Sequence, residues 1–309
     1  MIDHRNYDVI IIGAGPAGLT AGLYTARARL ASLLIEKALL GGQITNAERV
    51  ENFPGFPDGI SGFELTQLMH QQATNFGLET LTAEVIGIEL KEDKKVIKTT
   101  EGDFIARTLI IAGGSKRQTL GVPGEEEFTG KGVSYCATCD APFFREQPVA
   151  VVGGSDAAIT EALHLAQFAS KVMVIHRRDQ LRATAILQER AFAEPKIEFV
   201  WDATVEKIEG EGFVKRLRLN QIKTGGKSAL EVAGVFVSIG FKPDTAYLKD
   251  ILSLDPVGHI VTNEKTETEI PGIFAAGDIR FNSARQAITA AGDGATAAIY
   301  AQRFLTENK

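Results

Sequence analysis

The sequence predicts an α/β protein of two three-layer domains, the second inserted into the first. A chain of 309 residues is of a length that suits two domains. Residues 7–36 and 148–178 each show the same pattern, namely an apolar strand, a glycine-rich turn, a helix and a second strand. A third apolar strand, near residue 274, has no glycine-rich turn of its own.

The first unit begins with Tyr7–Ile12, an apolar and largely β-branched run typical of a strand that is buried on both faces. This run continues directly into the glycine-rich stretch Gly13–Gly18, followed by a helical stretch from Leu19 to about Leu30. A second strand, Ala31–Ile35, ends at Glu36. Together these segments predict a βαβ unit.

The turn of this unit has the GxGxxG spacing of a dinucleotide-binding loop. Gly13 allows the tight turn, Gly15 lets the backbone approach a pyrophosphate, and Gly18 permits close packing of the helix. Glu36 follows Gly13 by 23 residues and can accept a hydrogen bond from a ribose hydroxyl. The spacing alone is weak, but a strand before it, a helix after it and an acid at this distance predict a dinucleotide site.

The second unit repeats the pattern. Strand 148–152 leads into Gly153-Gly154-Ser155-Asp156-Ala157-Ala158, and a helix to about Ala169 and a strand Lys171–Ile175 follow. Ser155 occupies the position of closest pyrophosphate approach, where glycine is usual. Its hydroxymethyl group either crowds the phosphate or donates a hydrogen bond to it.

The charge after the second strand is opposite in the two units. Arg177 and Arg178 follow Gly153 by 24 and 25 residues, where the first unit has Glu36. Guanidinium groups pair with a 2′-phosphate that a carboxylate would repel, so we expect the second site to hold NADP(H), with Arg182 close by. The alternative is a solvated run of charge, which is the commoner origin of neighbouring arginines.

The order of the segments predicts how the domains are connected. Strand 272–276 ends in Gly277-Asp278 and precedes a helix of small residues, so we expect it to complete the first domain. Residues 1–117 with 246–309 then form one Rossmann-like domain, and residues 118–245 form the inserted one. Residues 113–117 and 240–244 are candidate hinges, although glycine at a strand end is often ordinary turn chemistry.

The chain contains two cysteines, Cys136 and Cys139, and both lie in the inserted domain. A bridge across two residues closes too small a loop to stabilise a fold much, and a zinc site lacks a second Cys pair or spaced histidines. A Cys-x-x-Cys pair at a helix start exchanges readily with other thiols. Asp140 can shuttle a proton to the departing thiolate, unless it serves only as a cap.

Bulk composition excludes several classes. The net charge of −6 argues against nucleic-acid binding, which needs clustered Lys and Arg. The charge-free segment Val9–Ala26 holds several glycines and a proline, so we expect a buried strand and a packed helix there rather than a membrane span. No targeting element is visible, and a cytoplasmic location is expected by default.

Five groups of residues together resemble the low-molecular-weight thioredoxin reductases over essentially the whole chain. They are Cys136-Ala137-Thr138-Cys139-Asp140, His176-Arg177-Arg178-Asp179, Gly41-Gly42-Gln43 with residues 50–55, Gly277-Asp278, and Arg285-Gln286-Ala287-Ile288. The resemblance implies electron transfer from NADPH to FAD, then to the Cys136/Cys139 disulfide, then to the disulfide of thioredoxin or a similar small redox protein. It also implies a homodimer and a large rotation of the inserted domain.

The resemblance assigns residues to each cofactor. Those for FAD are Gly13, Gly15, Pro16, Gly18, Glu36, Gly42, Gln43, Asn52, Val85, Gly113, Gly277, Asp278, Arg285, Gln286 and Ala287, with Asp278 on the ribitol and Gln286-Ala287 near the flavin ring. Those for NADPH are Gly153, Gly154, Ser155, Asp156, Ala157, His176, Arg177, Arg178 and Arg182. It further implies that Cys139 faces the flavin, that Cys136 attacks the substrate disulfide, and that Asp140 acts as acid.

Two departures from the family pattern leave alternatives open. Ser155 replaces a glycine, and Ala141-Pro142 follows Asp140 where glycine is usual. The donor could therefore be NADH or a reduced electron-transfer protein, and the acceptor a glutaredoxin-like or peroxiredoxin-linked protein. A dithiol oxidase and a flavin-binding sensor are the remaining alternative functions. Phe143-Phe144-Arg145 is a candidate docking patch, unless the phenylalanines belong to the core.

Overall fold

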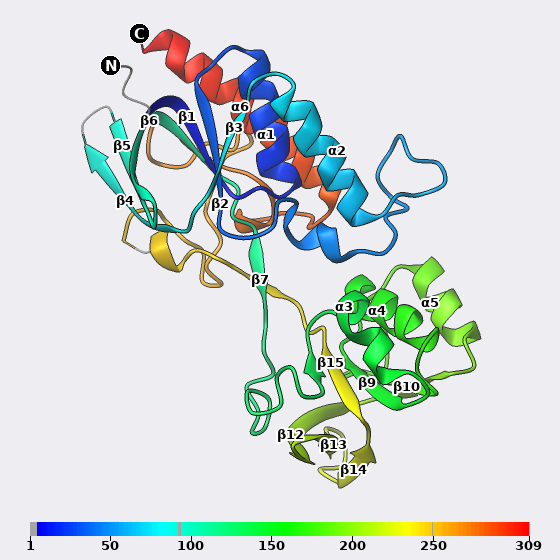
Figure 1. Cartoon of the computed structure of the whole chain (residues 1–309). Helices are drawn as coiled ribbons and strands as arrows, with labels where there is room; N and C mark the ends of the chain where they lie inside the picture. The colour runs from blue at the N-terminus through cyan, green and yellow to red at the C-terminus, as the bar shows by residue number, and fades with distance from the viewer. Residues whose placement is uncertain (1–4, 92–93, 249, 309) are drawn as a thin grey trace. The chain divides into compact units, whose positions relative to one another are not determined.

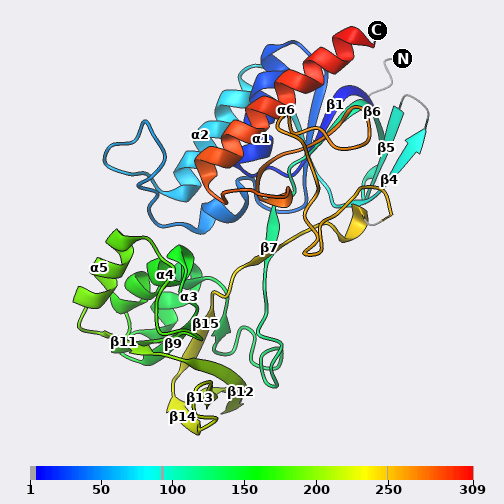
Figure 2. The same cartoon turned by 180° about the vertical axis from the view of Figure 1, so that it is seen from behind.

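The computed structural model describes residues 5–91, 94–248 and 250–308, and the chain forms two compact units (Figures 1 and 2). Unit 1 comprises residues 1–116 and 242–309, and unit 2 comprises residues 117–241. The second boundary lies four residues before the expected position at 245. Asp244 and Thr245 belong to unit 1 because Asp244 pairs with Lys37 at 2.8 Å and the Thr245 hydroxyl donates to the Gly258 carbonyl at 2.6 Å.

Among its described residues, unit 1 has one large sheet, three α-helices and several short 3-10 helices. Its elements are β1 (Asn6–Ile12), α1 (Pro16–Arg27), β2 (Ser32–Glu36), η1 (Gly42–Asn46), α2 (Gly62–Thr74), β3 (Glu79–Thr82), β4 (Val85–Lys91), β5 (Lys94–Thr99), β6 (Gly102–Ile111), η3 (Ala246–Leu248), β17 (Ile273–Ala275), η4 (Gly277–Ile279) and α6 (Ala287–Glu307).

The sheet of unit 1 is parallel at its centre. Strands run in the order β3-β2-β1-β6, with β17 also paired to β6, and all of these pairs are parallel. Strands β5 and β4 continue the sheet as an antiparallel arm. Through its pairing with β6, β17 belongs to the same sheet as the N-terminal strands.

Both faces of this sheet are buried. Helices α1, α2 and α6 cover one face, where side chains such as Val9, Ile11 and Phe274 are fully buried (Figure 1). The opposite face packs against the antiparallel arm and residues 247–260 instead of helices. Segment 9–26 is thus a buried strand followed by a packed helix, as predicted.

Helix α1 is shifted relative to the prediction, because it begins at Pro16 and ends at Arg27. Proline suits the first helical position, where the missing N–H would have no partner inside the helix. Arg29 adopts a left-handed backbone with φ of 59°, so the helix cannot continue to Leu30.

The two crossings between the units form a short two-stranded sheet of β7 (Ser115–Arg117) and β16 (Phe241–Pro243). Unit 2 itself contains β8 (Val133–Ser134), α3 (Ala137–Asp140), η2 (Ala141–Phe144), β9 (Pro148–Val152), α4 (Asp156–Ala166), β10 (Lys171–Ile175), α5 (Ala185–Ala193), β11 (Ile197–Val200), β12 (Ala203–Glu211), β13 (Phe213–Gln221), β14 (Lys227–Glu231) and β15 (Gly234–Val237).

Unit 2 is a three-layer domain around a parallel sheet with the order β11-β10-β9-β15-β8. Helices α3, α4 and α5 pack on one face. The antiparallel sheet β12-β13-β14 packs on the other face, as both views show (Figure 2). The predicted fold class is confirmed, with antiparallel strands in place of the second helical layer.

In the parts of the chain that the structure describes, every helix is too short or too polar to pass through a membrane.

Candidate active site

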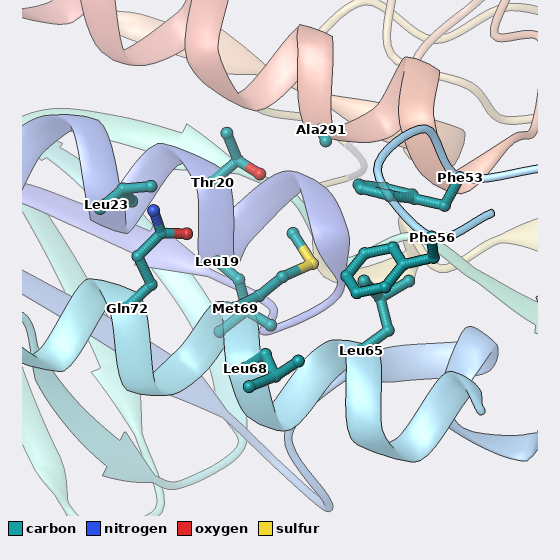
Figure 3. A pocket seen from close by; sticks show the side chains of 10 residues that line it. All are labelled: Leu19, Thr20, Leu23, Phe53, Phe56, Leu65, Leu68, Met69, Gln72 and Ala291. Carbon is teal, nitrogen blue, oxygen red and sulfur yellow. The ribbon is translucent and has the colours of Figure 1, made fainter. Parts of the chain in front are cut away.

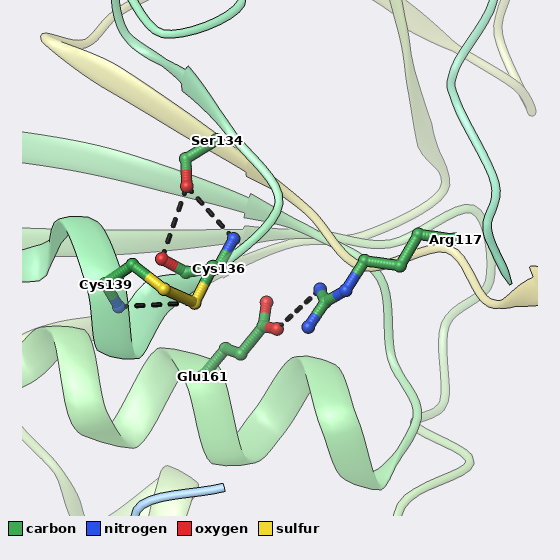
Figure 4. Close-up of a disulfide and its surroundings, with 5 residues drawn as sticks. All are labelled: Arg117, Ser134, Cys136, Cys139 and Glu161. Atoms are coloured by element: carbon green, nitrogen blue, oxygen red, sulfur yellow. Dashed lines mark hydrogen bonds and ion pairs between the residues drawn. A yellow bond between two sulfur atoms is a disulfide. The ribbon is translucent and has the colours of Figure 1, made fainter. Parts of the chain in front are cut away.

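The two cysteines form a disulfide at the start of α3 (Figure 4). Their Cα atoms are 5.3 Å apart, within the usual range for a disulfide. Strand β8 positions the pair, because Cys136 follows it by two residues and serves as the N-cap of α3. The sequence separation of three therefore yields a bonded pair at the carboxyl end of an edge strand.

The sulfur of Cys136 has a hydrogen-bond donor that Cys139 supplies from its backbone. The Cys139 N–H donates to Cys136 Sγ at 3.3 Å. Ser134 holds the same residue from the other side, since its hydroxyl accepts from the Cys136 N–H at 3.0 Å. A donor aimed at sulfur favours the thiolate, so Cys136 is the better placed of the two to carry negative charge after reduction.

The residues after Cys139 divide between core and surface. Asp140 is the last residue of α3 and is half-buried. Phe144 packs edge-on against Phe236, with ring centroids 5.4 Å apart. Phe143 is 76% exposed. Phe144 therefore belongs to the core, which was the alternative to a role in the docking patch. Phe143 remains a candidate docking residue.

The second glycine-rich loop connects β9 to α4. Gly153 has a φ of 155°, and Gly154 lies against the ring of His176, which a Cβ on Gly154 would meet at 2.6 Å. Ser155 is the N-cap residue of α4, and its side chain makes no capping hydrogen bond. Asp156 accepts from the Thr184 N–H at 2.6 Å, which fixes the segment that carries the arginines. Ala157 is half-buried in the first turn of α4.

Beyond this loop lies a basic cavity of about 470 Å³, lined by residues 177–182, Asp202 and Lys223. The three predicted arginines, Arg177, Arg178 and Arg182, are exposed there. His176 lies behind them, and burial, aided by the charge of Arg182, lowers its pKa. The structure thus brings the predicted second-site residues together.

Lys223 is a lining residue that sequence patterns did not reveal. It pairs with Asp202 at 2.9 Å and with Asp179 at 3.0 Å. The turn between β13 and β14 brings it to the cavity. That approach depends on the antiparallel sheet, so nothing in the local sequence could have indicated it.

The first glycine-rich loop connects β1 to α1. Gly13 has a φ of 98°, and a Cβ there would meet the Ala112 carbonyl oxygen at 2.4 Å. A Cβ on Gly18 would lie 1.8 Å from the Gly13 carbonyl oxygen. A Cβ on Gly15 would meet no atom within 4 Å, so the backbone there has an open side. The open side at Gly15 is where a phosphate can approach the backbone closely.

Glu36, at the end of β2, ties the loop to the strand. Its Oε2 accepts from the Ala14 N–H at 2.8 Å and its Oε1 accepts from the Ala38 N–H at 3.1 Å. Each carboxylate oxygen has a further lone pair. The side chain is therefore fixed and still able to accept from a sugar hydroxyl.

Four more of the predicted flavin-site residues adjoin this loop or the N-terminus of α6. Gly42 lies close to Gly15, because a Cβ on Gly42 would meet the Gly15 Cα at 3.1 Å. Gly113 adjoins Gly13 in the same way, at 2.8 Å. Asn52 donates to the Gln286 side chain at 3.0 Å. Residues far apart in sequence thus meet as expected.

The remaining predicted flavin-site residues take different positions. Gln43 donates to the Ser115 carbonyl at 3.4 Å, and Ala287 is the first residue of α6. Pro16 opens α1. Val85 begins β4 and packs on the core of unit 1, and no hydrogen bond links it to the loop residues within the described chain.

Asp278 lies on η4, close to further charged groups that motifs did not indicate. Burial raises the pKa of Asp278, and the Ser283 hydroxyl donates to it at 3.2 Å. Asp293 accepts from the Gly277 N–H at 3.0 Å and from the Arg280 guanidinium at 2.6 Å. These contacts hold the end of β17 against α6.

Arg285 belongs to a second chain of contacts in the same region. It has a left-handed backbone with φ of 56° and donates to Nε2 of His259 at 3.3 Å. His259 in turn pairs with Asp255 at 2.9 Å. Asp255 thus orients His259, and His259 holds Arg285, an arginine that the resemblance assigned to the flavin site.

Unit 1 also has an apolar cavity of about 240 Å³ (Figure 3). Side chains of α1 and α2, Ala291 of α6, and the aromatic rings of Phe53 and Phe56 line it. Leu68 on α2 is exposed at its rim.

The arrangement fits two dinucleotides and a dithiol. Unit 1 has an open phosphate loop, a fixed acid after β2 and a buried Asp278. Unit 2 has a phosphate loop, a basic cavity and the disulfide. These donor sets suit FAD in the first unit and NADPH in the second.

Comparison with known proteins extends the similarity to nearly the whole chain. The family model described as pyridine nucleotide-disulphide oxidoreductase matches residues 7–294. The chain is 48% identical over 308 residues to a thioredoxin reductase of Streptomyces coelicolor, covering 99% of this chain and 95% of that protein. It is 46% identical to one of Bacillus subtilis, covering 99% and 97%. A solved thioredoxin reductase from Lactococcus lactis has a TM-score of 0.96 and 44% identity, covering 97% of this chain and 99% of that one.

Proposed function

Because the chain belongs to the thioredoxin reductases, within the pyridine nucleotide-disulphide oxidoreductase family, we propose that Cys136 and Cys139 carry electrons from FAD to the disulfide of thioredoxin. The observation that carries this proposal is the disulfide itself, which holds both cysteines of the chain in the unit that also has the basic cavity. Bound FAD accepts hydride from NADPH and supplies two electrons to a nearby disulfide.

We assign FAD to unit 1 and NADPH to unit 2. The loop from Gly13 to Gly18 would hold the FAD pyrophosphate, with Glu36 accepting from the ribose. Arg177 and Arg178 would pair with the 2′-phosphate of NADPH. The opposite charges after β2 and β10 support this division over the reverse one.

The two thiols have distinct roles in the proposed reaction. Reduction breaks the Cys136–Cys139 bond, and the Cys139 N–H stabilises the charge on Cys136 Sγ. Cys136 then attacks a sulfur of the thioredoxin disulfide, and a mixed disulfide forms as one thioredoxin thiolate leaves. Cys139 attacks Cys136 Sγ, which restores the internal disulfide and releases the second thiolate. Asp140 can supply a proton to a leaving thiolate.

Thioredoxin is the proposed acceptor because the relatives from Streptomyces coelicolor and Bacillus subtilis are named thioredoxin reductases. The exposed Phe143, four residues after Cys139, gives an apolar side chain for a protein partner next to the dithiol.

We also propose a homodimer through unit 1. The cavity beside Phe53 and Phe56 is apolar (Figure 3). On the adjoining helix α2, Phe63 and Leu68 expose their side chains. Apolar surface of this kind is typical of an interface. Light scattering should give a mass near 67 kDa for the wild type, twice the 33.3 kDa chain, and a smaller mass for Leu68→Glu.

A reaction that consumes NADPH and maintains dithiols suits the reducing conditions of the cytoplasm, where we place the protein. Cell fractionation with an antibody to the chain would test this location.

The direct test of the function is reduction of thioredoxin from the same source with NADPH, scored by thiol release. The wild type should turn over, and Cys136→Ser and Cys139→Ser should each abolish turnover while retaining FAD. Full activity in either variant would remove the dithiol from the reaction.

A further inference from the structure

Next to the disulfide lies a buried ion pair that the proposed reaction does not use. Glu161 on α4 accepts from Arg117 Nη1 through Oε1 at 2.8 Å. The Glu161 side chain is 12% exposed and that of Arg117 is 20% exposed. Burial of charged groups costs free energy, so a pair held this far from water calls for a physical role.

The carboxyl group of Glu161 lies between the disulfide and the guanidinium of Arg117 (Figure 4). Helix α3, which carries the disulfide, packs on α4 through small residues such as Ala137 and Ala162, which brings the two elements close. The second carboxyl oxygen, Oε2, is buried, and among the described residues no hydrogen bond to it has good geometry, although Ser238 lies close enough to lower the pKa of Glu161. This oxygen is available to respond to charge at the redox centre.

Two opposing effects act on the ionisation of Glu161. Burial raises its pKa; the charge and hydrogen bond of Arg117, a hydrogen bond from Ser238 and the charge of His164 oppose that rise but do not cancel it. Further titratable side chains on the two helices are Asp140 on α3, and Asp156 and His164 on α4. With Arg117 in place, the charge closest to the sulfur atoms on this side is negative.

We propose that Glu161, held by Arg117, is a positioning residue that disfavours the thiolate of Cys136 and thereby sets the thiol pKa and reduction potential of the Cys136/Cys139 pair. The inference rests on the proposed function of that pair. Two opposing contributions act on the same sulfur atom, because the Cys139 N–H favours charge on Cys136 and the Glu161 carboxylate opposes it. The balance prevents the reduced enzyme from holding its electrons too tightly.

The direction of the expected change in thiolate stability follows from the position of the two charges, because the carboxyl group of Glu161 lies between the disulfide and the guanidinium of Arg117. In Glu161→Gln the carboxylate charge is lost and the Arg117 cation remains, so the Cys136 thiolate becomes more stable. In the double variant Arg117→Gln/Glu161→Gln both charges are lost, and the thiolate returns close to its original stability. A purely structural role would make the double variant at least as disturbed as the single one.

The test measures Cys136 directly in the full-length flavoprotein with Cys139→Ser, where Cys136 is the single thiol. The rate of alkylation by iodoacetamide is followed from pH 5 to pH 10. Glu161→Gln should move the midpoint to lower pH and raise the rate at pH 7 by roughly threefold to tenfold. Arg117→Gln/Glu161→Gln should stay within about twofold of the parent, and Glu161→Asp should keep the parent midpoint.

Glu198→Gln is the matched control. Glu198 also pairs with a cation, Lys171 at 2.7 Å, but it lies on β11, at the opposite edge of the sheet from β8. Its removal should leave the midpoint unchanged. An unchanged midpoint in Glu161→Gln, or equal shifts in the single and double variants, would overturn the proposal.

A second measurement uses the intact dithiol and needs no thioredoxin. Equilibration with glutathione at a pH above the thiol pKa of the parent, where the thiolate predominates, should show the Glu161→Gln variant more reduced by the factor that corresponds to its pKa shift, at about 30 mV per tenfold change. Equal reduction of wild type and variant would contradict the proposal. Because neither assay scores turnover, a negative result would leave the proposed reaction standing, and loss of the reaction in the cysteine variants would be seen separately.

Discussion

Replacing Arg177 and Arg178 by alanine should remove the preference for NADPH over NADH. Both guanidinium groups line the basic cavity and are exposed. Each charge-assisted contact with a 2′-phosphate should therefore contribute about 1 to 1.5 kcal/mol, at or just below the range of about 1.5 to 3 kcal/mol for hydrogen bonds to charged groups. Two contacts give about 2 to 3 kcal/mol, which is a loss of roughly 30-fold to 160-fold in kcat/KM with NADPH. Activity with NADH should change little, because NADH has no 2′-phosphate.

The assay compares initial rates with the two nucleotides at several concentrations and the same thioredoxin. Lys215→Ala is a suitable control, because Lys215 is an exposed cation of unit 2 that pairs with Glu211 at 2.6 Å outside the cavity. Its NADPH preference should equal that of the wild type. If Arg177→Ala/Arg178→Ala kept the wild-type preference, the cavity would not be the 2′-phosphate site.

Three further predictions concern stability. Gly18→Ala should abolish FAD retention and lower Tm, because the new Cβ would lie 1.8 Å from a backbone oxygen. The flavin absorbance of the purified variant measures FAD retention, and full flavin content would contradict the prediction. Phe236→Ala should lower the free energy of unfolding of unit 2 by about 3 to 5 kcal/mol. Urea unfolding followed by the fluorescence of Trp201, the single tryptophan, measures this loss. A loss below about 1 kcal/mol would show that neighbouring side chains fill the cavity that the substitution leaves. Asp244→Asn should cost about 0.5 to 1 kcal/mol at pH 7. Burial raises the pKa of the Asp244 carboxyl, but its two lysine partners hold it below its usual value. The stability that the carboxylate contributes is therefore present above the unfolded-state pKa and is lost as the pH falls through the folded-state pKa. An equal cost of Asp244→Asn at pH 2.5 would refute the ion-pair explanation.

Local sequence patterns predicted the two nucleotide-binding units well. Strands β9 and β10 have the expected bounds, and β1 agrees within a residue, because buried β-branched runs leave little choice of structure. The helix ends were less predictable. Arg29 stops α1 through a left-handed backbone that its side chain does not signal.

Contacts between distant segments could not be predicted from spacing. Lys223 reaches the basic cavity through the β13–β14 turn, and Glu161 meets Arg117 across 44 residues of sequence. Neither has a motif, because the partners are set by how α4, β7 and the antiparallel sheet pack. Phe144 was ambiguous for the same reason, since an aromatic residue before a strand suits both core and surface until its neighbour Phe236 is known.

The most direct measurement is an anaerobic titration of the FAD-loaded protein with NADPH, in which thiols per chain are counted before and after oxidised thioredoxin is added. If the Cys136/Cys139 pair carries the electrons, two thiols should appear in the enzyme and then be found in thioredoxin, with the disulfide restored. Bleaching of the flavin without new thiols, or thiols that stay in the enzyme when thioredoxin is present, would contradict that role.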